Sequence, residues 1–102
     1  MSDKPPAAPQ QLQLQIEIDP ATANGVFVNL AMVNHTETEF TLDLMYLQPQ
    51  APRAVVRSRA IMTPKHMKRL LLALQENIGK YESVFGKIDV SNAPHFPAPG
   101  MN

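Results

Sequence analysis

Apolar side chains recur at even sequence numbers along four separate runs of this chain, and this shared parity limits how the runs can pair. The first run, residues 11–18, alternates strictly between apolar and polar residues, which is the pattern of a strand with one buried face. The other runs cover residues 26–33, 39–47 and 53–62. Turn-forming residues separate them, so each run is predicted to form one strand.

The parity favours an antiparallel meander. In an antiparallel pair, the position numbers of opposed residues add to a constant. Sums of 44, 72 and 100 for successive pairs place even-numbered residues opposite even-numbered residues throughout. The same sums centre the connections on Thr22, Thr36 and Gln50, which lie inside the turn segments. The predicted sheet therefore has four strands and one apolar face.

A long helix is predicted after the fourth strand. Thr63 supplies an N-cap hydroxyl, Pro64 suits the first helical position, and Gly86 is a C-terminal stop signal. Apolar residues recur between them at helical spacing: Met67, Leu71, Leu74, Ile78, Tyr81 and Phe85. The predicted fold class is α+β, a four-stranded antiparallel β-meander with one C-terminal helix packed on its apolar face. The helix is longer than the strands need, so a second subunit is expected to cover part of it.

Length and composition allow one small domain. Residues 1–10 and 89–102 are rich in proline and small residues and are predicted to be disordered tails around a single domain, residues 11–88. About 75 ordered residues give marginal stability, so a homo-oligomer, a dimer or larger, is expected. The chain has no cysteine and no apolar run long enough to cross a membrane, so a cytoplasmic protein without a membrane partner is expected.

No pattern of residues predicts catalysis. His35, His66 and His95 lie apart and lack metal-ligand spacing, and Glu39 and Asp43 are expected on the solvated face of a strand. The four glycines are isolated, so no phosphate-binding loop is present. We therefore predict that the protein is not an enzyme and that it uses neither a cofactor nor a metal.

The formal net charge is zero, but the charges are unevenly distributed. Residues 1–43 sum to −5, residues 44–75 to +6 and residues 76–102 to −1. The predicted register places Asp43 opposite Arg57, and Glu39 diagonal to Arg59. Cross-strand pairs of this kind would neutralise both arginines within the sheet.

The remaining basic residues stand at the start of the predicted helix, where the helix dipole is already positive. Lys65, His66, Lys68 and Arg69 are therefore candidates for binding an anion or an acidic protein partner, although a solvated basic turn is the simpler explanation. Nucleic acid is an alternative that is not favoured. Residues 53–69 contain no aromatic side chain to stack on bases, and the isoelectric point is near 6.8.

The outer face of the predicted sheet is a second candidate surface. Odd-numbered apolar residues are expected there, and a monomer would rarely expose a patch of this kind. The candidates for an interface are Phe27, Val33, Met45, Val55 and Ile61. Contact between subunits is the simplest use of this face, and capture of an extended apolar peptide is an alternative.

Two segments also carry a family pattern. Residues 39–44 read EF.LDL, and residues 58–88 read SR.I..P.H.KRL...L..N...YE..FG.I. This pattern, with Asn24, resembles a family of short bacterial proteins of unknown function, DUF3467. The resemblance implies a small single-domain protein and transfers no catalytic residue. The order of four strands and a helix is also similar to the core of the bacterial export chaperone, an oligomeric binder of unfolded chains, which is an analogy of fold alone.

The sequence thus favours a non-enzymatic, oligomeric protein-interaction module that binds its partner through the outer sheet face or the basic helix start. One alternative is a protein that binds the charged backbone of a nucleic acid, or another polyanion. Another is a chaperone-like holder of apolar segments.

Overall fold

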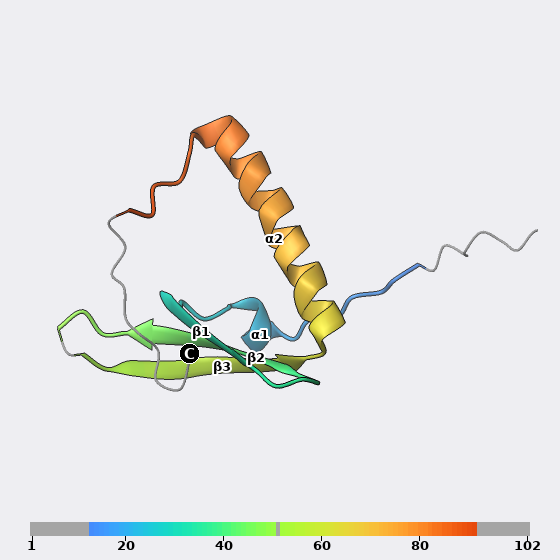
Figure 1. Ribbon diagram of the computed structural model, residues 1–102, viewed down its shortest axis with the longest axis horizontal. Helices are drawn as coiled ribbons and strands as arrows, with labels where there is room; N and C mark the ends of the chain where they lie inside the picture. The colour runs from blue at the N-terminus through green and yellow to red at the C-terminus, as the bar shows by residue number, and fades with distance from the viewer. Residues whose placement is uncertain (1–12, 51, 92–102) are drawn as a thin grey trace, which may run out of the picture.

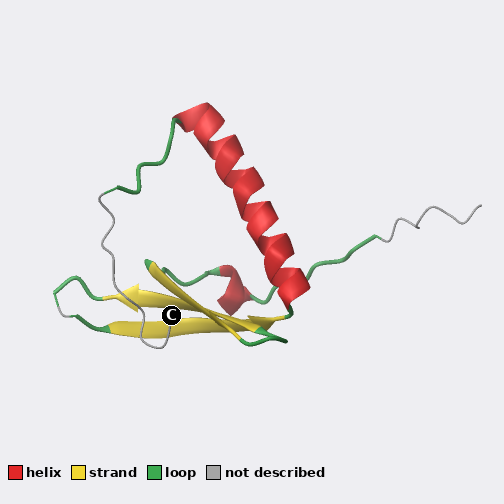
Figure 2. Cartoon of the chain, in the orientation of Figure 1, coloured by secondary structure: helices red, strands yellow, loops and turns green. Residues whose placement is uncertain are grey.

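The chain forms a small antiparallel sheet followed by one long helix (Figure 1). The structure is a computed structural model that describes residues 13–50 and 52–91. A short helix, α1 (Pro20–Ala23), precedes the strands β1 (Leu30–His35), β2 (Phe40–Leu47) and β3 (Ala54–Met62), and α2 (Pro64–Phe85) follows them. The strand order is β1-β2-β3, with β2 in the centre (Figure 2). The α+β class and the order of sheet before helix are confirmed.

The predicted first strand is wrong for the described residues. Residues 13–18 are extended but pair with no strand, and their apolar side chains Leu14, Ile16 and Ile18 are exposed. The segment leads away from the sheet (Figure 1). Helix α1 replaces the predicted turn, and it begins at Pro20, a residue that suits the first turn of a helix. The sheet therefore has three strands instead of four. The predicted tails lie outside the described residues, except for residues 89–91.

The register of the sheet also differs from the prediction. Val33 lies opposite Leu42, so the β1–β2 pair sums to 75 instead of 72. An odd sum places odd-numbered residues of β1 on the same face as even-numbered residues of β2. In the β2–β3 pair, Leu44 lies opposite Ser58 but Met45 lies opposite Val56, because a bulge at Arg57 shifts the register. The apolar side chains are therefore divided between the two faces.

Asn29 extends the β1–β2 pairing by one more residue. Its backbone N–H donates to the carbonyl of Met45 at 2.9 Å. Its side-chain Oδ1 accepts from the N–H of Leu47 at 2.7 Å, and its Nδ2 donates to the Leu47 carbonyl at 3.2 Å. The amide thus satisfies both backbone groups of Leu47, as a neighbouring strand residue would.

The predicted boundaries of α2 are confirmed. The Thr63 hydroxyl accepts a hydrogen bond from the N–H of His66 at 3.4 Å, with Pro64 in the first turn. At the other end Gly86 has φ 101°, a conformation that favours glycine, and its N–H donates to the carbonyl of Glu82 at 3.0 Å. Both ends are therefore set by local chemistry.

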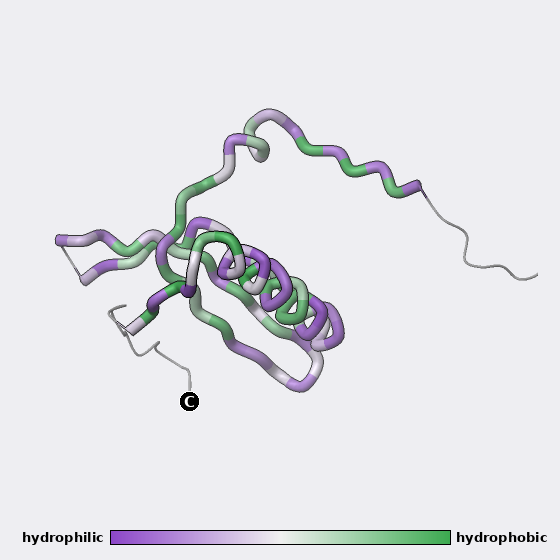
Figure 3. The backbone as a smooth tube through the Cα atoms, turned by 90° about the horizontal axis from the view of Figure 1, so that it is seen from above, coloured by the Kyte–Doolittle hydropathy of each residue, from purple (hydrophilic) through white to green (hydrophobic). Residues whose placement is uncertain are grey.

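Helix α2 does not pack against the sheet as predicted. The extensive contacts between elements are those of β1 with β2 and of β2 with β3, and no residue of α2 is buried. The helix rises from the end of β3 at a steep angle to the sheet (Figure 1), and in the view from above it lies over the strands (Figure 3). Only Thr63 separates β3 from α2, and its extended backbone sets the steep angle at which the helix leaves the strand.

Replacing Asn29 with Ala should weaken the sheet. The change leaves the N–H and carbonyl of Leu47 without their amide partner, which should lower the free energy of unfolding by about 1–2 kcal/mol. Chemical denaturation followed by circular dichroism measures this. Asn34→Ala is the matched control, because Asn34 lies in the same sheet and its side chain makes no hydrogen bond within the described residues. Equal losses in the two variants would contradict the role of the Asn29 amide.

Replacing Thr63 with Ala should destabilise the first turn of α2 by about 1 kcal/mol, because the N–H of His66 loses its cap. Hydrogen exchange at the first amides of α2 measures the local effect. Thr63→Ser keeps the hydroxyl and should leave exchange nearly unchanged. Faster exchange in both variants would show that the methyl group of Thr63, and not its hydroxyl, holds the turn.

Candidate interaction surfaces

The basic residues predicted as a site all lie in the first two turns of α2. Lys65, His66, Lys68 and Arg69 are exposed, and the first turn contains no acidic residue. Within residues 13–50 and 52–91, the ion pairs join other residues, Arg59 to Asp43 and Lys80 to Glu76. The four side chains therefore form one exposed basic group. Its binding of an anion stays a prediction.

The five predicted outer-face residues do not share a face. Met45 and Ile61 lie on the face that carries Asp43, because Ile61 opposes Thr41 in the register. Val33 opposes Leu42 and Val55 opposes Tyr46, which places both on the other face. Phe27 precedes β1, and its ring meets the ring of Tyr46 edge-on, with 6.2 Å between centroids. Met45 is also buried, with 7% of its surface exposed. The single outer-face patch is therefore not formed.

The most buried polar group of the described residues is the carboxylate of Asp43 in the central strand. Asp43 is 1% exposed and lies directly opposite Arg59. Nε of Arg59 donates to Oδ1 at 2.7 Å, and the Nη2 group donates to Oδ2 at 3.0 Å. Two parallel hydrogen bonds of this kind fix the orientation of both groups. A cross-strand pair was predicted correctly, but with Arg57 as the partner of Asp43.

The bulge explains the change of partner. It gives Arg57 no opposed residue, and the Arg57 guanidinium lies over the ring of Tyr46, 5.4 Å from its centroid. Arg59 is therefore the residue that forms the ion pair with Asp43. Its hydrogen bonds, and secondly its charge, hold the pKa of Asp43 below the ordinary value of 3.8, against the burial of the carboxylate. The same pair raises the pKa of Arg59.

One side of α2 carries a row of apolar residues, which we call the α2 stripe and which are all exposed except the half-buried Met67: Met67, Leu71, Leu74, Ile78, Tyr81 and Phe85. Leu74 is 50% exposed and Ile78 is 46% exposed, in the middle of the stripe. At its end, the rings of Tyr81 and Phe85 lie 5.0 Å apart. The periodicity of the stripe was predicted from the sequence, but its exposure was not. The sequence gives no signal for exposure, because a stripe that covers a sheet has the same spacing.

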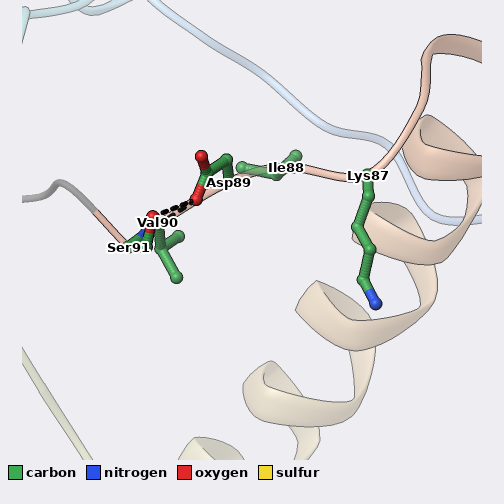
Figure 4. Close-up of a pocket in the computed structure, with 5 residues that line it drawn as sticks. All are labelled: Lys87, Ile88, Asp89, Val90 and Ser91. Carbon is green, nitrogen blue, oxygen red and sulfur yellow. Dashed lines mark hydrogen bonds between the residues drawn. The ribbon is translucent and has the colours of Figure 1, made fainter.

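A shallow hollow of about 380 Å³ follows the end of α2 (Figure 4). Its lining is the consecutive segment from Lys87 to Ser91. Within it, Oδ1 of Asp89 accepts from the N–H of Ser91 at 2.9 Å and from its hydroxyl at 2.6 Å, which lowers the pKa of Asp89. The carboxylate is therefore engaged in a local turn.

The described residues bring together no set of catalytic or metal-binding side chains. His35 stacks on Phe40 in the sheet, with 5.3 Å between ring centroids, while His66 lies on α2 and His95 lies outside the described residues. No group of three His, Asp or Glu side chains in the described part could hold a metal ion. Neither described helix has the length and apolar content needed to cross a bilayer.

Comparison with known proteins identifies the family. Residues 1–90 match the family described as "Protein of unknown function (DUF3467)". The chain belongs to this family. No curated protein and no solved structure shows a significant similarity to it. The family resemblance noted in the sequence is thus confirmed, while the likeness to the bacterial export chaperone has no support from these comparisons.

Replacing Asp43 with Asn should lower the melting temperature at neutral pH and flatten its dependence on pH. A carboxylate whose pKa is lowered by folding adds stability above its unfolded pKa, and the stability is lost as the pH falls through the folded pKa. The wild type should therefore lose stability below about pH 4, and the variant should lose less. Thermal melts from pH 7 to acid measure this. Glu37→Gln is the control, since Glu37 is exposed in the turn before β2 and its side chain makes no hydrogen bond or ion pair within the described residues. Parallel curves for wild type and Asp43→Asn would contradict the role of Asp43.

Proposed function

We propose that this protein is a non-enzymatic interaction module that works as a homo-oligomer, and that the α2 stripe is its assembly surface. The observation that carries the proposal is the exposure of the stripe along a helix of 22 residues. An amphipathic helix normally buries its apolar side against another element. Within the described residues α2 has no such element.

The shortage of buried apolar surface supports assembly. Among the described residues, Met45 is the only buried apolar side chain. Small domains need most of their apolar surface covered to offset the entropy of ordering the chain. Burying a large apolar side chain completely contributes about 1.5–3 kcal/mol, so covering the exposed parts of the stripe residues would add several kcal/mol in total. A partner on the stripe therefore supplies stability that the single chain lacks.

A second copy is the partner that we favour. It brings an identical stripe, so association hides two apolar surfaces at once, as in common two-fold dimers. The other functions suggested by the sequence use overlapping surfaces. A holder of unfolded chains would use the same stripe, and a polyanion binder would use the exposed basic start of α2, for which no further observation points to a ligand.

Sedimentation of the full-length chain over a range of concentrations tests the proposal. The wild type should sediment as a dimer or larger, and Leu74→Asp should weaken association at least tenfold, because a carboxylate in the middle of the stripe would have to be buried. Leu72→Asp is the matched control. Leu72 is 54% exposed, close to the value for Leu74, and two residues earlier it lies on the opposite side of α2.

A wild type that stays monomeric at high micromolar concentration would overturn the proposal. Suppression of the aggregation of an unfolded client by that monomer, lost in Leu74→Asp, would then assign the stripe to holding unfolded chains. Equal weakening of association by both substitutions would show that the α2 stripe is not the assembly surface.

A further inference from the structure

The spacing of the α2 stripe is symmetrical along the helix. Its six residues are separated by intervals of four, three, four, three and four, which read the same in both directions. Intervals that alternate between four and three residues are those of the heptad repeat of a coiled coil. The centre of the stripe is position 76. A second α2 running in the opposite direction can therefore match every stripe residue with one of its own.

This antiparallel register gives evenly filled layers. Opposed residues add to 152, so Met67 meets Phe85 of the second copy, Leu71 meets Tyr81, and Leu74 meets Ile78. Each aromatic ring then lies against an aliphatic or thioether side chain. A parallel pair would instead place Tyr81 on Tyr81 and Leu71 on Leu71, so wide and narrow layers would follow one another. Even packing density favours the antiparallel arrangement.

The residues beside the stripe are complementary in the same register. On one flank, at seven-residue intervals, lie Lys68, Gln75 and Glu82, and on the other lie Leu70, Asn77 and Val84. Antiparallel pairing brings the same flank of the two helices together. Lys68 of each copy then faces Glu82 of the other copy, and the two Gln75 side chains face each other. Leu70 then meets Val84, which is 72% exposed in the single chain. A parallel pair would bring unlike flanks together and separate Lys68 from Glu82.

The charges at the ends of α2 agree with this orientation. The first turn has no acid and the last turn has no base, which is opposite to what the helix's own dipole favours. In an antiparallel pair, Lys68 lies beside the negative C-terminal end of the second helix, while Lys65 and Arg69 lie on the outer side of α2. Glu82 is available there, because only its Oε2 is engaged, accepting the N–H of Ile88 at 2.9 Å.

We propose that α2 pairs with α2 of a second copy as an antiparallel two-stranded coiled coil in which opposed stripe residues add to 152. The inference rests on the proposed function and names the partner and its register. Helix α2 rises away from the sheet (Figure 1), and none of its residues is buried, so its apolar side is open to a second helix. Its 22 residues span roughly 33 Å.

Charge exchange in the full-length chain tests the register. Lys68→Glu should weaken self-association about tenfold, because two ion pairs become two repulsions. Glu82→Lys should do the same, and the double variant should restore association to near the wild-type value. Lys80→Glu is the control, since it makes the same charge change on the far side of α2. Weakening that the double variant does not repair would overturn the proposal.

Cross-linking tests the direction, and the chain has no native cysteine to interfere. With a short bismaleimide, Gln75→Cys should form covalent dimers, and so should a mixture of Lys68→Cys and Glu82→Cys chains. Leu71→Cys should not, because its two copies lie ten residues apart along the axis, roughly 15 Å. Cross-linking through Leu71→Cys would indicate a parallel pair and overturn the proposal.

The two levels of the hypothesis fail in different ways. A chain that never associates contradicts the proposed function. A chain that associates, but shows no cross-link at Gln75→Cys and no rescue by the Lys68→Glu, Glu82→Lys double variant, keeps the proposed function and overturns the antiparallel pairing.

Discussion

Thr63 is the only residue between the last strand and the long helix, and much of the architecture follows from this short connection. The extended backbone of Thr63, followed by Pro64 in the first turn of the helix, sets the angle at which α2 leaves β3. Helix α2 turns back above the sheet but rises from it at a steep angle, and no residue of the helix is buried (Figure 1). The sheet in turn holds little apolar core, and its most buried group is the Asp43 carboxylate.

The parts of this structure that depend on local chemistry could be predicted from the sequence. The boundaries of α2 follow from the Thr63 hydroxyl, Pro64 and Gly86, which act within one turn of the helix. The pair of Glu76 and Lys80, with 3.7 Å between Oε2 and Nζ, follows from a spacing of four residues. The turns before β2 and before β3 were also placed correctly. Each of these features involves residues that are close in sequence, so no choice among distant partners is needed.

The parts that depend on pairing between strands could not be predicted. The position numbers of opposed residues in β1 and β2 add to 75, where 72 was predicted. This odd difference turns every side chain of β1 to the other face, although the alternation within the strand is unchanged. The bulge at Arg57 has no marker in the sequence, yet it moves the partner of Asp43 from Arg57 to Arg59. For the same reason the five expected outer-face residues form no common surface. Alternation specifies which residues of a strand lie together, but not on which side of the sheet.

The basic start of α2 was the least expected feature of the sequence, and the proposed pairing gives it a physical explanation within the protein. Lys65, Lys68 and Arg69 lie at the positive end of the helix dipole, where basic side chains are unfavourable unless negative charge is near. A bound anion is one source of that charge. The acidic C-terminal turn of an identical helix is another, and it supplies the opposing dipole as well as Glu82. In the proposed pairing, the same association would cover the α2 stripe and bring Lys68 beside Glu82 of the second copy. Under this explanation Lys68 helps to set the direction of assembly and needs no separate ligand.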